Sequence, residues 1–582
     1  MDNTKAESLL AIEVGEIHTR AALFDVVNGA YRFLAMGVAP TTTTAPYADI
    51  REGVRLALDQ LAEVCGRRLI GENEQLITPQ RLDGSGIDQV VATLSAGQPI
   101  RIAIVGLLEE VSVESAIHLA ETSYARVVEV LSLNDRRKME QRLGALLQAD
   151  PDLILIAGGT DGGASRAVMR MVEIVALACQ LMQRVTRPHV LYVGNQALVE
   201  KVTNALELVA IPHIAPNIRP SLESEWQTPA QQVLADLVRT TRLDQIKGSA
   251  ELNAWTKEHF YPTASAFERI IRFLSKIYDP TRGVLGIDVG ASATTIAVAS
   301  GGEATLRVYP RLGLGSDPTG LLEHIRLSEI GAWLPFSISE NSLNDYLHNK
   351  ALYPASIPTT AEELAIEQAV TRQVIRTATR LTPGCYADGS SPGRTSFLRW
   401  FEPILASGSA LTNAPSWGQT ALILLDALQP VGITTLVVDQ YHLASMLGAA
   451  ASLNPTLVVQ VLESSAFLNL GTVVSPISSA RAGTPILRLR AQRDSGEPME
   501  MEVRQGTLEV FPLPLGQPAR LHLQPLHRAD IGMGAPGRGG TLQVVGGALG
   551  VMIDARGRPL HLPQDAQRRN ELYQKWLKAL GG

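Results

Sequence analysis

The sequence predicts an α/β fold with two related lobes, a parallel α/β domain inserted between them and a C-terminal all-β domain. Three observations lead to this prediction. One hairpin pattern occurs twice, strands and helices alternate between the two copies, and short strands with strict alternation follow the second copy. The chain has 582 residues, too many for one hydrophobic core, so several domains are expected. We expect five segments, at residues 1–99, 100–282, 283–455, 456–563 and 564–582.

The hairpin pattern is clearest at residues 284–299. An apolar run ends in Asp288, a turn rich in glycine and hydroxyl groups follows, and a second apolar run returns from it. Glycine lets a phosphate approach the main chain where a Cβ would block it, and backbone N–H groups and hydroxyls then bind the anion. The carboxylate is of the kind that holds a hydrated Mg²⁺ or orients a water. The turn residues suited to this role are Gly290, Ser292, Thr294 and Thr295.

Residues 9–22 carry the same pattern and overlay the second copy without a gap. At a constant offset of 275 residues (288 − 13), Glu13 falls on Asp288, Gly15 on Gly290 and Thr19 on Thr294. Two phosphate hairpins so far apart predict two related lobes that face a cleft.

Strands and helices alternate from residue 100 onward, with short connections. Such units predict a parallel sheet with helices on its faces. A Gly-rich turn at 158–163 lies between a strand and a helix, at the edge where parallel sheets bind ligands. A plain strand-to-helix turn explains it about equally well. The expected strands are 100–106, 127–131, 152–157 and 190–195, and the expected helices are 111–123, 135–149, 164–184 and one that ends at 208.

A second small-residue turn follows the predicted strand at 404–407. Gly408 and Ser409 would let a flat ring lie against the main chain, where larger side chains would collide with it. A simple strand-to-helix connection is the alternative. Other helices are expected at 48–65, 228–243, 264–278, 360–380 and 417–428, whereas 71–99 has the composition of a loop and 317–358 shows no clear period.

The pattern becomes β after residue 455. Strict alternation at 499–504, 507–510 and 520–523, with turns rich in Gly and Pro, predicts a small barrel or sandwich. The glycine-rich run at 532–540 has no helix after it, so we expect a structural turn rather than a phosphate loop. A polar helix is expected at 564–580.

The composition narrows the class of protein. A net charge of −7 and a pI near 5.9 argue against a general nucleic-acid binder or a binder of anionic membranes. The three cysteines are far apart and form no Cys-x-x-Cys, so we expect neither a disulfide framework nor a zinc site, and a reducing cytoplasm fits. The N-terminus lacks the features of a secretory signal, and no uncharged apolar run approaches the roughly 18 residues needed to span a bilayer.

These pieces, in this order, resemble the superfamily of sugar kinases, heat-shock chaperones and actins. More closely, the chain resembles the glutamate mutase L (MutL/GlmL) family, whose members are encoded beside cobalamin-dependent carbon-skeleton mutases and are unrelated to mismatch repair. The resemblance covers nearly the whole chain, and the segments that carry it are 9–22, 157–163, 217–220, 287–295, 406–409 and 546–560.

The resemblance implies an actin-like twin-lobe (ribonuclease-H-like) ATPase fold and use of ATP with Mg²⁺. Glu13 and Asp288 would hold the hydrated cation, and one of them would position the attacking water. The implied function is ATP-dependent chaperoning or reactivation of a cobalamin-dependent mutase subunit. The remaining implied contacts are Gly15, Thr19, Gly290, Ser292, Thr294 and Thr295 to phosphates, and Gly408 and Ser409 to adenosine.

The sequence departs from the family pattern in its phosphate turns. Glu13 stands where the family has Asp, and Glu16 stands where it has Ser or Thr, which places a second carboxylate in a phosphate turn. The second hairpin lacks one Gly and the closing Asp, and the adenosine turn has lost glycines as well. Two other hypotheses therefore stay open: a non-catalytic, self-associating scaffold with a degraded nucleotide site, and, least favoured, a small-molecule kinase.

Overall fold

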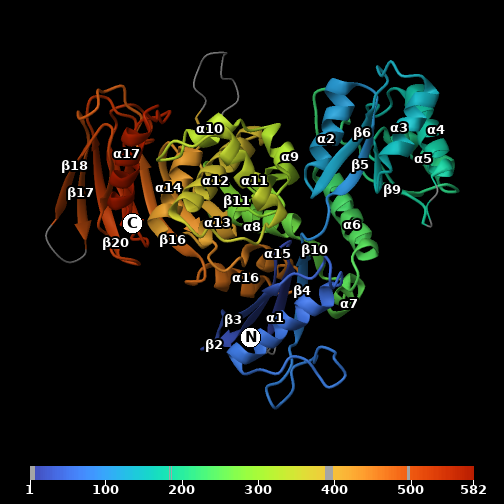
Figure 1. Ribbon diagram of the computed structural model, residues 1–582, viewed down its shortest axis with the longest axis horizontal. Helices are drawn as coiled ribbons and strands as arrows, with labels where there is room; N and C mark the ends of the chain where they lie inside the picture. Colours follow the sequence, from blue (N-terminus) through green and yellow to red (C-terminus); the bar gives the residue numbers. More distant parts are fainter. Residues whose placement is uncertain (1–6, 183, 185, 387–396, 494–497, 582) are drawn as a thin grey trace. The chain divides into compact units, whose positions relative to one another are not determined.

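The structure, a computed structural model, describes residues 7–182, 184, 186–386, 397–493 and 498–581 (Figure 1). The chain forms two compact units. Unit 1 comprises residues 1–24 and 34–266, and unit 2 comprises residues 25–33 and 267–582.

The first sheet of unit 1 has five strands in the order β10-β4-β1-β2-β3. The middle strand β1 pairs with β2 in antiparallel sense and with β4 in parallel sense, and β4 pairs in parallel with β10. One side of α1, including Val54, Leu58 and Leu61, packs into the core of this sheet. The bounds are β1 (Leu9–Val14), β2 (His18–Val27), β3 (Ala30–Pro40), α1 (Ile50–Cys65), β4 (Gln89–Leu94) and β10 (Phe260–Pro262).

The prediction that all of 71–99 forms a loop is wrong. The run Gln89–Leu94 is too short to show a period, yet it forms β4, which is almost fully buried beside β1. A buried strand with neighbours on both sides has little alternation to reveal it.

The second sheet of unit 1 is parallel throughout, in the order β6-β5-β7-β8-β9, as the alternating pattern predicts. Helices α3, α4 and α5 cover one face and α2 and α6 cover the other (Figure 1). A π-helical turn (Glu109–Val113) leads into α2, a 3-10 turn (Gln196–Leu198) leads into α5, and α7 (Ser249–Trp255) follows α6. The bounds are β5 (Ile100–Val105), α2 (Glu114–Ala120), β6 (Ala125–Leu131), α3 (Met139–Ala149), β7 (Leu153–Ile156), α4 (Ser165–Leu181), β8 (His189–Tyr192), α5 (Val199–Leu206), β9 (Ile211–Ile214) and α6 (Thr228–Gln245).

Unit 2 contains a mixed sheet of eight strands in the order β13-β12-β11-β14-β15-β16-β22-β19. Its first five strands repeat the first sheet of unit 1, because β11 pairs antiparallel with β12 and parallel with β14, and β14 pairs parallel with β15. The bounds are β11 (Val284–Val289), β12 (Thr294–Ser300), β13 (Glu303–Tyr309), β14 (Ile404–Ser407), β15 (Gly432–Val438), β16 (Leu468–Ser475), β19 (Leu508–Phe511) and β22 (Val551–Asp554).

The repeated strand order supports the prediction of two related lobes. In both five-strand sets the hairpin strand with a carboxylate as its next-to-last residue lies in the middle, flanked by the returning strand and a parallel strand from later in the chain. The two copies of the hairpin pattern therefore belong to two copies of one five-strand arrangement.

Helices of unit 2 pack on this sheet around one large core. The region 317–358, which shows no period in the sequence, contains three short helices, α9 to α11. The bounds are α8 (Thr263–Ile277), whose first residues belong to unit 1, α9 (Pro318–Leu322), α10 (Leu327–Gly331), α11 (Glu340–Leu352), α12 (Ala361–Leu381), α13 (Ser409–Thr412), α14 (Trp417–Leu428), α15 (Ala444–Ala450), α16 (Pro455–Leu462) and α17 (Ala566–Ala579).

The predicted all-β segment at 456–563 needs a correction. It opens with the helix α16, and three of its strands, β16, β19 and β22, extend the sheet of the second lobe. The other four form a separate antiparallel sheet in the order β18-β17-β20-β21. Alternation reveals a strand but not its partner, so the sequence alone could not divide these strands between two sheets. The bounds are β17 (Pro485–Arg493), β18 (Met499–Arg504), β20 (Pro518–Pro525) and β21 (Gly540–Val545).

The run 532–540 lies in the connection between β20 and β21 as a structural turn, as expected. A Cβ at Gly539 would lie 2.3 Å from the carbonyl oxygen of Leu523, so the close approach of two backbone segments requires glycine there. The segment boundaries at 99, 282 and 455 stay predictions.

A buried ion network ties β22 to the second lobe. Asp554 binds both Arg556 (2.9 Å) and Arg558 (2.8 Å), and Arg556 also reaches Asp426 on α14 (2.7 Å). Burial alone would raise the pKa of Asp554, but the two guanidinium groups hold it well below its ordinary value. All four side chains are 5% exposed or less. Removal of one member would leave a buried charge without a partner. The network therefore holds the end of β22 against α14.

Candidate functional site

The two hairpins have the same register. Glu13 lies opposite Arg20 across the first ladder, and Asp288 lies opposite Thr295 across the second. Each turn is closed by the glycine N–H, which donates to a carbonyl oxygen three residues later, at 3.0 Å in the first hairpin and 2.9 Å in the second. The structure thus confirms the overlay of residues 9–22 on 284–297 at a constant offset.

In the second hairpin, a carboxylate lies between two hydroxyl-bearing neighbours at the carboxyl edge of the sheet. Asp288 pairs with Thr295 on β12 and with Ser407 on β14. Asp288 is partly exposed, whereas Thr295 and Ser407 are buried. In parallel strands this edge is where ligands bind, so Asp288 is well placed to meet one.

Gly408 brings the second small-residue turn against the end of β11, next to Asp288 in the sequence. Its φ of 111° lies in the region that favours glycine, and a Cβ there would lie 2.2 Å from the carbonyl oxygen of Val289. The short helix α13 begins with Ser409 directly after it. The structure therefore brings Asp288, Gly290, Gly408 and Ser409 together at one edge of unit 2.

The two threonines at equivalent turn positions do not present their hydroxyls to this edge. Thr294 is fully buried, and its hydroxyl donates to the carbonyl oxygen of Leu312 at 2.6 Å. Thr19 is also fully buried, and its hydroxyl lies 3.0 Å from that of Thr41, which donates to the carbonyl oxygen of Gly15 at 2.8 Å. Both hydroxyls therefore make hydrogen bonds inside the protein and stabilise the turns. Ser292 stays partly exposed at the tip of the second turn.

The carboxylate of the first hairpin is ion-paired. Glu13 Oε2 lies 3.1 Å from Arg20 Nη1, and the two side chains are only 9% and 13% exposed. The sequence analysis missed Arg20, although a four-residue turn between the ladder positions 14 and 19 places it directly opposite Glu13. A metal role for Glu13 would require this pair to open.

The extra carboxylate in the first turn faces the protein. Glu16 Oε2 accepts a hydrogen bond from the backbone N–H of Gly97 at 3.0 Å. Burial raises the pKa of Glu16, against the lowering effects of that N–H and of Arg242. Its negative charge is thus partly satisfied by groups outside the hairpin.

A further carboxylate at the same edge of unit 2 escaped the sequence analysis. Asp439 follows β15, is 1% exposed, and accepts backbone N–H groups of Leu443 and Ala444 at 2.8 Å each. The hydroxyl of Ser407 approaches it at 3.4 Å. The signal was available, since Asp439 ends an apolar strand as Asp288 does. Asp439 holds the start of α15 next to Ser407, which precedes Gly408.

The residues of unit 2 fit a nucleotide phosphate and a hydrated cation. Gly408 allows the turn after β14 to lie directly against the backbone of Val289, and Gly290 has only one atom, the carbonyl oxygen of Ala293 at 3.1 Å, near the position of a Cβ. Within the described ranges, no group of three or more His, Cys, Asp or Glu could hold a metal ion. Mg²⁺ is commonly held by one or two carboxylates together with substrate phosphates and water, so Asp288 alone is compatible with it. The cleft between the two hairpins stays a prediction, since they belong to different units.

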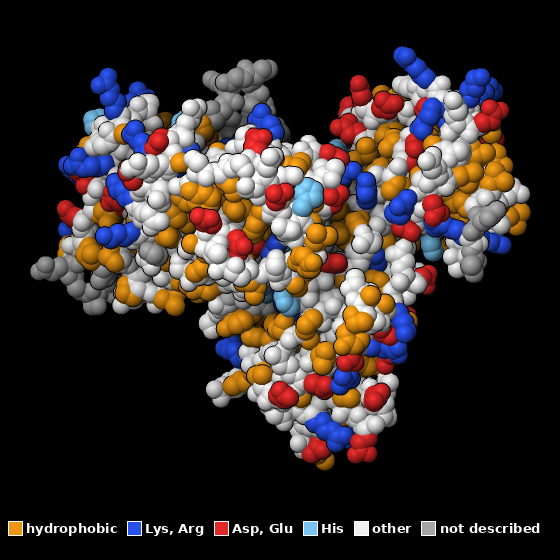
Figure 2. Space-filling model, viewed as in Figure 1, with side chains coloured by type: hydrophobic (Ala, Val, Ile, Leu, Met, Phe, Trp, Pro, Cys, Tyr) orange, Lys and Arg blue, Asp and Glu red, His pale blue; other side chains and the backbone are white. Residues whose placement is uncertain are grey.

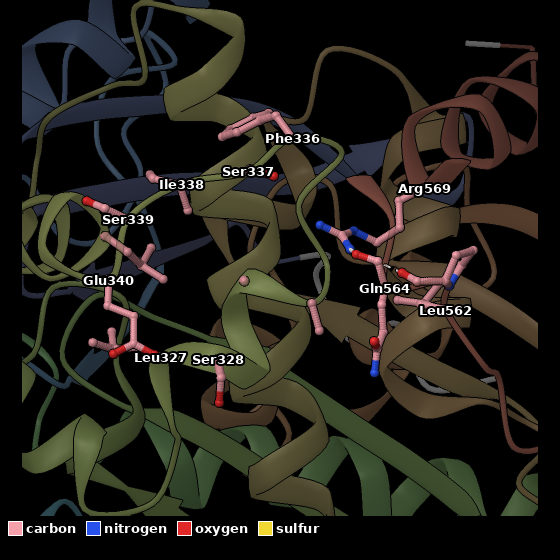
Figure 3. A pocket seen from close by; sticks show the side chains of 14 residues that line it. Leu327, Ser328, Phe336, Ser337, Ile338, Ser339, Glu340, Leu562, Gln564 and Arg569 are labelled. Carbon is pink, nitrogen blue, oxygen red and sulfur yellow. Dashed lines mark hydrogen bonds between the residues drawn. The ribbon is translucent and has the colours of Figure 1, made fainter. Parts of the chain in front are cut away.

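A pocket of about 370 Å³ lies elsewhere in unit 2, between α10, α11 and residues 562–569 (Figure 3). Arg569 reaches toward it opposite Phe336 and Ile338. The guanidinium already donates to the carbonyl oxygens of Leu334 (2.9 Å) and Pro563 (3.1 Å), so it holds the C-terminal segment in place. None of the predicted site residues lines this pocket.

Two further findings concern the surface and the helices. On the face drawn in Figure 2, Lys and Arg side chains of the described residues are interspersed with Asp and Glu. No helix within the described ranges is both long and apolar enough to cross a membrane.

Several solved structures share a general likeness with the chain. The nucleotide-free acetone carboxylase is 14% identical, with 85% of this chain and 81% of that chain covered and a TM-score of 0.31. The nucleotide-free diol dehydratase-reactivating factor is 12% identical, with 77% and 99% covered and a TM-score of 0.28. Xylulose kinase from Bifidobacterium adolescentis is 12% identical, with 78% and 93% covered and a TM-score of 0.25. At these TM-scores the likeness carries no argument about fold or function.

The sequence comparisons are more decisive. "Protein MutL" of Clostridium tetanomorphum is 24% identical over 283 residues, which cover 47% of this chain and only 58% of that relative. A model of the family described as MutL protein matches residues 9–466, most of the chain. Together with the paired hairpins, this match shows that the chain belongs to the MutL (glutamate mutase L) family.

Proposed function

We propose that the chain binds ATP at the carboxyl edge of β11 and β14 and uses it to reactivate or chaperone a cobalamin-dependent mutase. The observation that carries the proposal is the cluster of Asp288, Gly290, Gly408 and Ser409, which the fold assembles from two distant stretches. Family membership supports the same reading, and the choice of a mutase as partner rests on the family resemblance alone.

Each residue has a part that its position allows. Gly290 offers a backbone approach for phosphate, the exposed side of Ser292 lies at the tip of the same turn, and Thr295 flanks Asp288 on the ladder. Gly408 and Ser409 border the adenosine. Asp288 would hold the hydrated Mg²⁺, which supplies charge neutralisation for the phosphates when it is bound. Gly15 would add a second phosphate contact from unit 1.

A non-catalytic scaffold is the second candidate, because one specific observation favours it. Glu13 is engaged with Arg20, and the hydroxyls of Thr19 and Thr294 are buried in the turns. A site in which one of the two carboxylates, Glu13, is held in an ion pair with Arg20 can bind a nucleotide without hydrolysing it. Loss of hydrolysis would leave an ATP-binding protein that acts by assembly, with itself or with a partner.

A thermal shift with Mg²⁺ and ATP separates binding from no binding. A ligand at 100 times its Kd should stabilise the folded state by about 2.7 kcal/mol. The proposal expects a saturable upward shift that Asp288→Asn reduces strongly. The absence of any shift at saturating nucleotide would remove the nucleotide proposal.

Phosphate release then separates a reactivating ATPase from a scaffold. A reactivating ATPase should release phosphate faster when a cobalamin-dependent mutase is present. It should also restore mutase activity only when ATP is present. Binding of ATP with no release, with or without the mutase, would favour the scaffold.

A further inference from the structure

The inserted parallel sheet of unit 1 has a strand order that defines a ligand position. In chain order its strands are β5, β6, β7, β8 and β9, and in space they run β6-β5-β7-β8-β9. The chain therefore moves outward in one direction from β5 to β6, and in the other direction from β7 onward. Sheets of this order bind ligands outside the carboxyl ends of the strands at the point of reversal, here between β5 and β7.

The loop at that point is the glycine-rich run 158–163. Gly158 has a φ of 140°, and a Cβ there would lie 2.9 Å from the side chain of Leu107, in the loop that follows β5. The two loops on either side of the reversal point are thus in close contact. Gly162 has a φ of 74° and no atom within 4 Å of where a Cβ would be, so the outer part of the loop is open.

The loop leads into a helix whose N-terminus lacks a cap. Ala164 is the N-cap of the 17-residue helix α4, it supplies no side-chain hydrogen bond, and the first turn carries no acidic residue. The uncapped N–H groups and the helix dipole favour an anion at this position. Arg166 is exposed in the same turn and adds positive charge.

A buried amide beneath the loop is the second, independent observation. Asn195 is fully buried, and its Oδ1 accepts hydrogen bonds from the backbone N–H groups of Gly162 (3.3 Å) and Ala197 (3.0 Å). Its Cβ lies 3.2 Å from the position of a Cβ on Gly159, so the amide lies directly under the loop. Its Nδ2 has no hydrogen-bond partner among the described residues. Because a buried donor without an acceptor is unfavourable, the amide that anchors the loop keeps one unused donor for an acceptor.

The neighbouring acidic groups limit the negative charge that a ligand can carry. Asp161 lies in the loop, but its Oδ1 is held by Asn217 Nδ2 at 2.9 Å and by the N–H of Gln196 at 3.1 Å. On the β5 side, Glu109 accepts from the hydroxyl of Ser132 at 2.8 Å, and Glu110 is exposed. These carboxylates disfavour a ligand with negative charge at both ends. One anionic group at the helix and an uncharged remainder fit best.

We infer that the 158–163 loop and the N-terminus of α4 bind the phosphate group of a small, otherwise uncharged phosphate monoester. This site is separate from the nucleotide site proposed for the hairpins, and it takes its own ligand. It gives the inserted domain a binding role of its own.

Calorimetric titration of the full chain with ribose 5-phosphate tests the inference, because this probe carries no adenine. Ala164→Asp places a carboxylate at the uncapped position, where it caps the helix and repels phosphate. Its affinity for the probe should fall at least about tenfold, while its thermal midpoint should not fall. Gln227→Asp puts the same charge at the uncapped N-cap of α6 and should leave the affinity unchanged.

Saturable binding by the wild type and by Gln227→Asp, with the loss confined to Ala164→Asp, supports the inference. No saturable binding by the wild type overturns it, as does equal affinity in Ala164→Asp. Loss of binding in Asp288→Asn instead would place the phosphate at the second hairpin and overturn it as well.

Discussion

The two hairpins share a register but differ in what surrounds the carboxylate. Glu13 lies between Arg20 and Thr93, and its charge is neutralised by an ion pair at 3.1 Å. Asp288 pairs in register with Thr295 and Ser407 and is partly exposed. One backbone arrangement therefore carries an internal ion pair in unit 1 and a partly exposed carboxylate in unit 2.

Carboxylates at equivalent positions of the two hairpins therefore need not bind the same groups. A carboxylate that is ion-paired with a buried guanidinium can bind a cation only if that pair opens, whereas a partly exposed carboxylate at the edge of the sheet is accessible to a ligand. In the second lobe, Gly408 lies in close contact with the backbone carbonyl of Val289, at the end of β11. The proposal therefore assigns nucleotide binding to the second hairpin and a supporting role to the first.

The largest effect is expected at Gly408. Gly408→Ala would put a Cβ 2.2 Å from a backbone oxygen at a φ of 111°, and neither the strand nor the turn can yield cheaply. We expect a loss of about 2–5 kcal/mol in the free energy of unfolding, measured by denaturant titration. Gly301→Ala serves as control, since it also has a positive φ but open space around it. Equal losses in the two variants would show that the contact with β11 is not the cause.

The next effect concerns the ion pair of the first hairpin. Glu13→Gln leaves Arg20 buried without its counter-charge and should cost about 1–3 kcal/mol of stability. The double variant Glu13→Gln with Arg20→Met should recover part of that loss, because no unpaired charge remains. If the double variant is as unstable as the sum of the single changes, the pair does not carry the stability of this hairpin.

The two buried threonines should respond unequally. Thr294→Val leaves the carbonyl oxygen of Leu312 without its donor and should cost about 1–2 kcal/mol. Thr19→Val should cost less than about 1 kcal/mol, because Thr41 keeps its bond to the carbonyl of Gly15. Thermal unfolding of both variants measures the difference. A larger loss in Thr19→Val would contradict the bracing roles assigned here.

The smallest effect is a pH dependence at Glu16. Because burial raises the pKa of this carboxyl in the folded state, its protonated form favours folding, and stability falls as pH rises from its ordinary pKa through the raised one. Glu16→Gln keeps an acceptor for the N–H of Gly97 and should remove that fall, so the variant is the more stable protein at neutral pH. Unfolding midpoints from about pH 4 to about pH 8 measure it. Glu72→Gln, on a side chain that is 95% exposed, is the control, and an identical pH profile for Glu16→Gln and wild type would contradict the assignment.

Local chemistry made the hairpins and the parallel sheet predictable. Turn glycines, terminal carboxylates and the alternation of strands with helices are short-range patterns, and the register of both hairpins follows from the length of their turns. Arg20 was within reach of the same reasoning, because the turn fixes which residue faces Glu13.

The remaining features depend on distant partners. Nothing in the run 468–475 shows that it joins β15 rather than the strands that follow it, and the bond from Thr294 to Leu312 joins residues 18 positions apart. Long-range pairing of this kind has no signature in a local pattern.

The central claim is that the second hairpin carries the nucleotide site. Calorimetric titration of Mg²⁺ and ATP into the wild type, Asp288→Asn and Glu13→Gln tests it most directly, at a temperature where all three are folded. We predict saturable binding by the wild type, at least about tenfold weaker binding by Asp288→Asn, and a change of no more than about twofold in Glu13→Gln. No binding by the wild type, or a greater loss in Glu13→Gln than in Asp288→Asn, would contradict the claim.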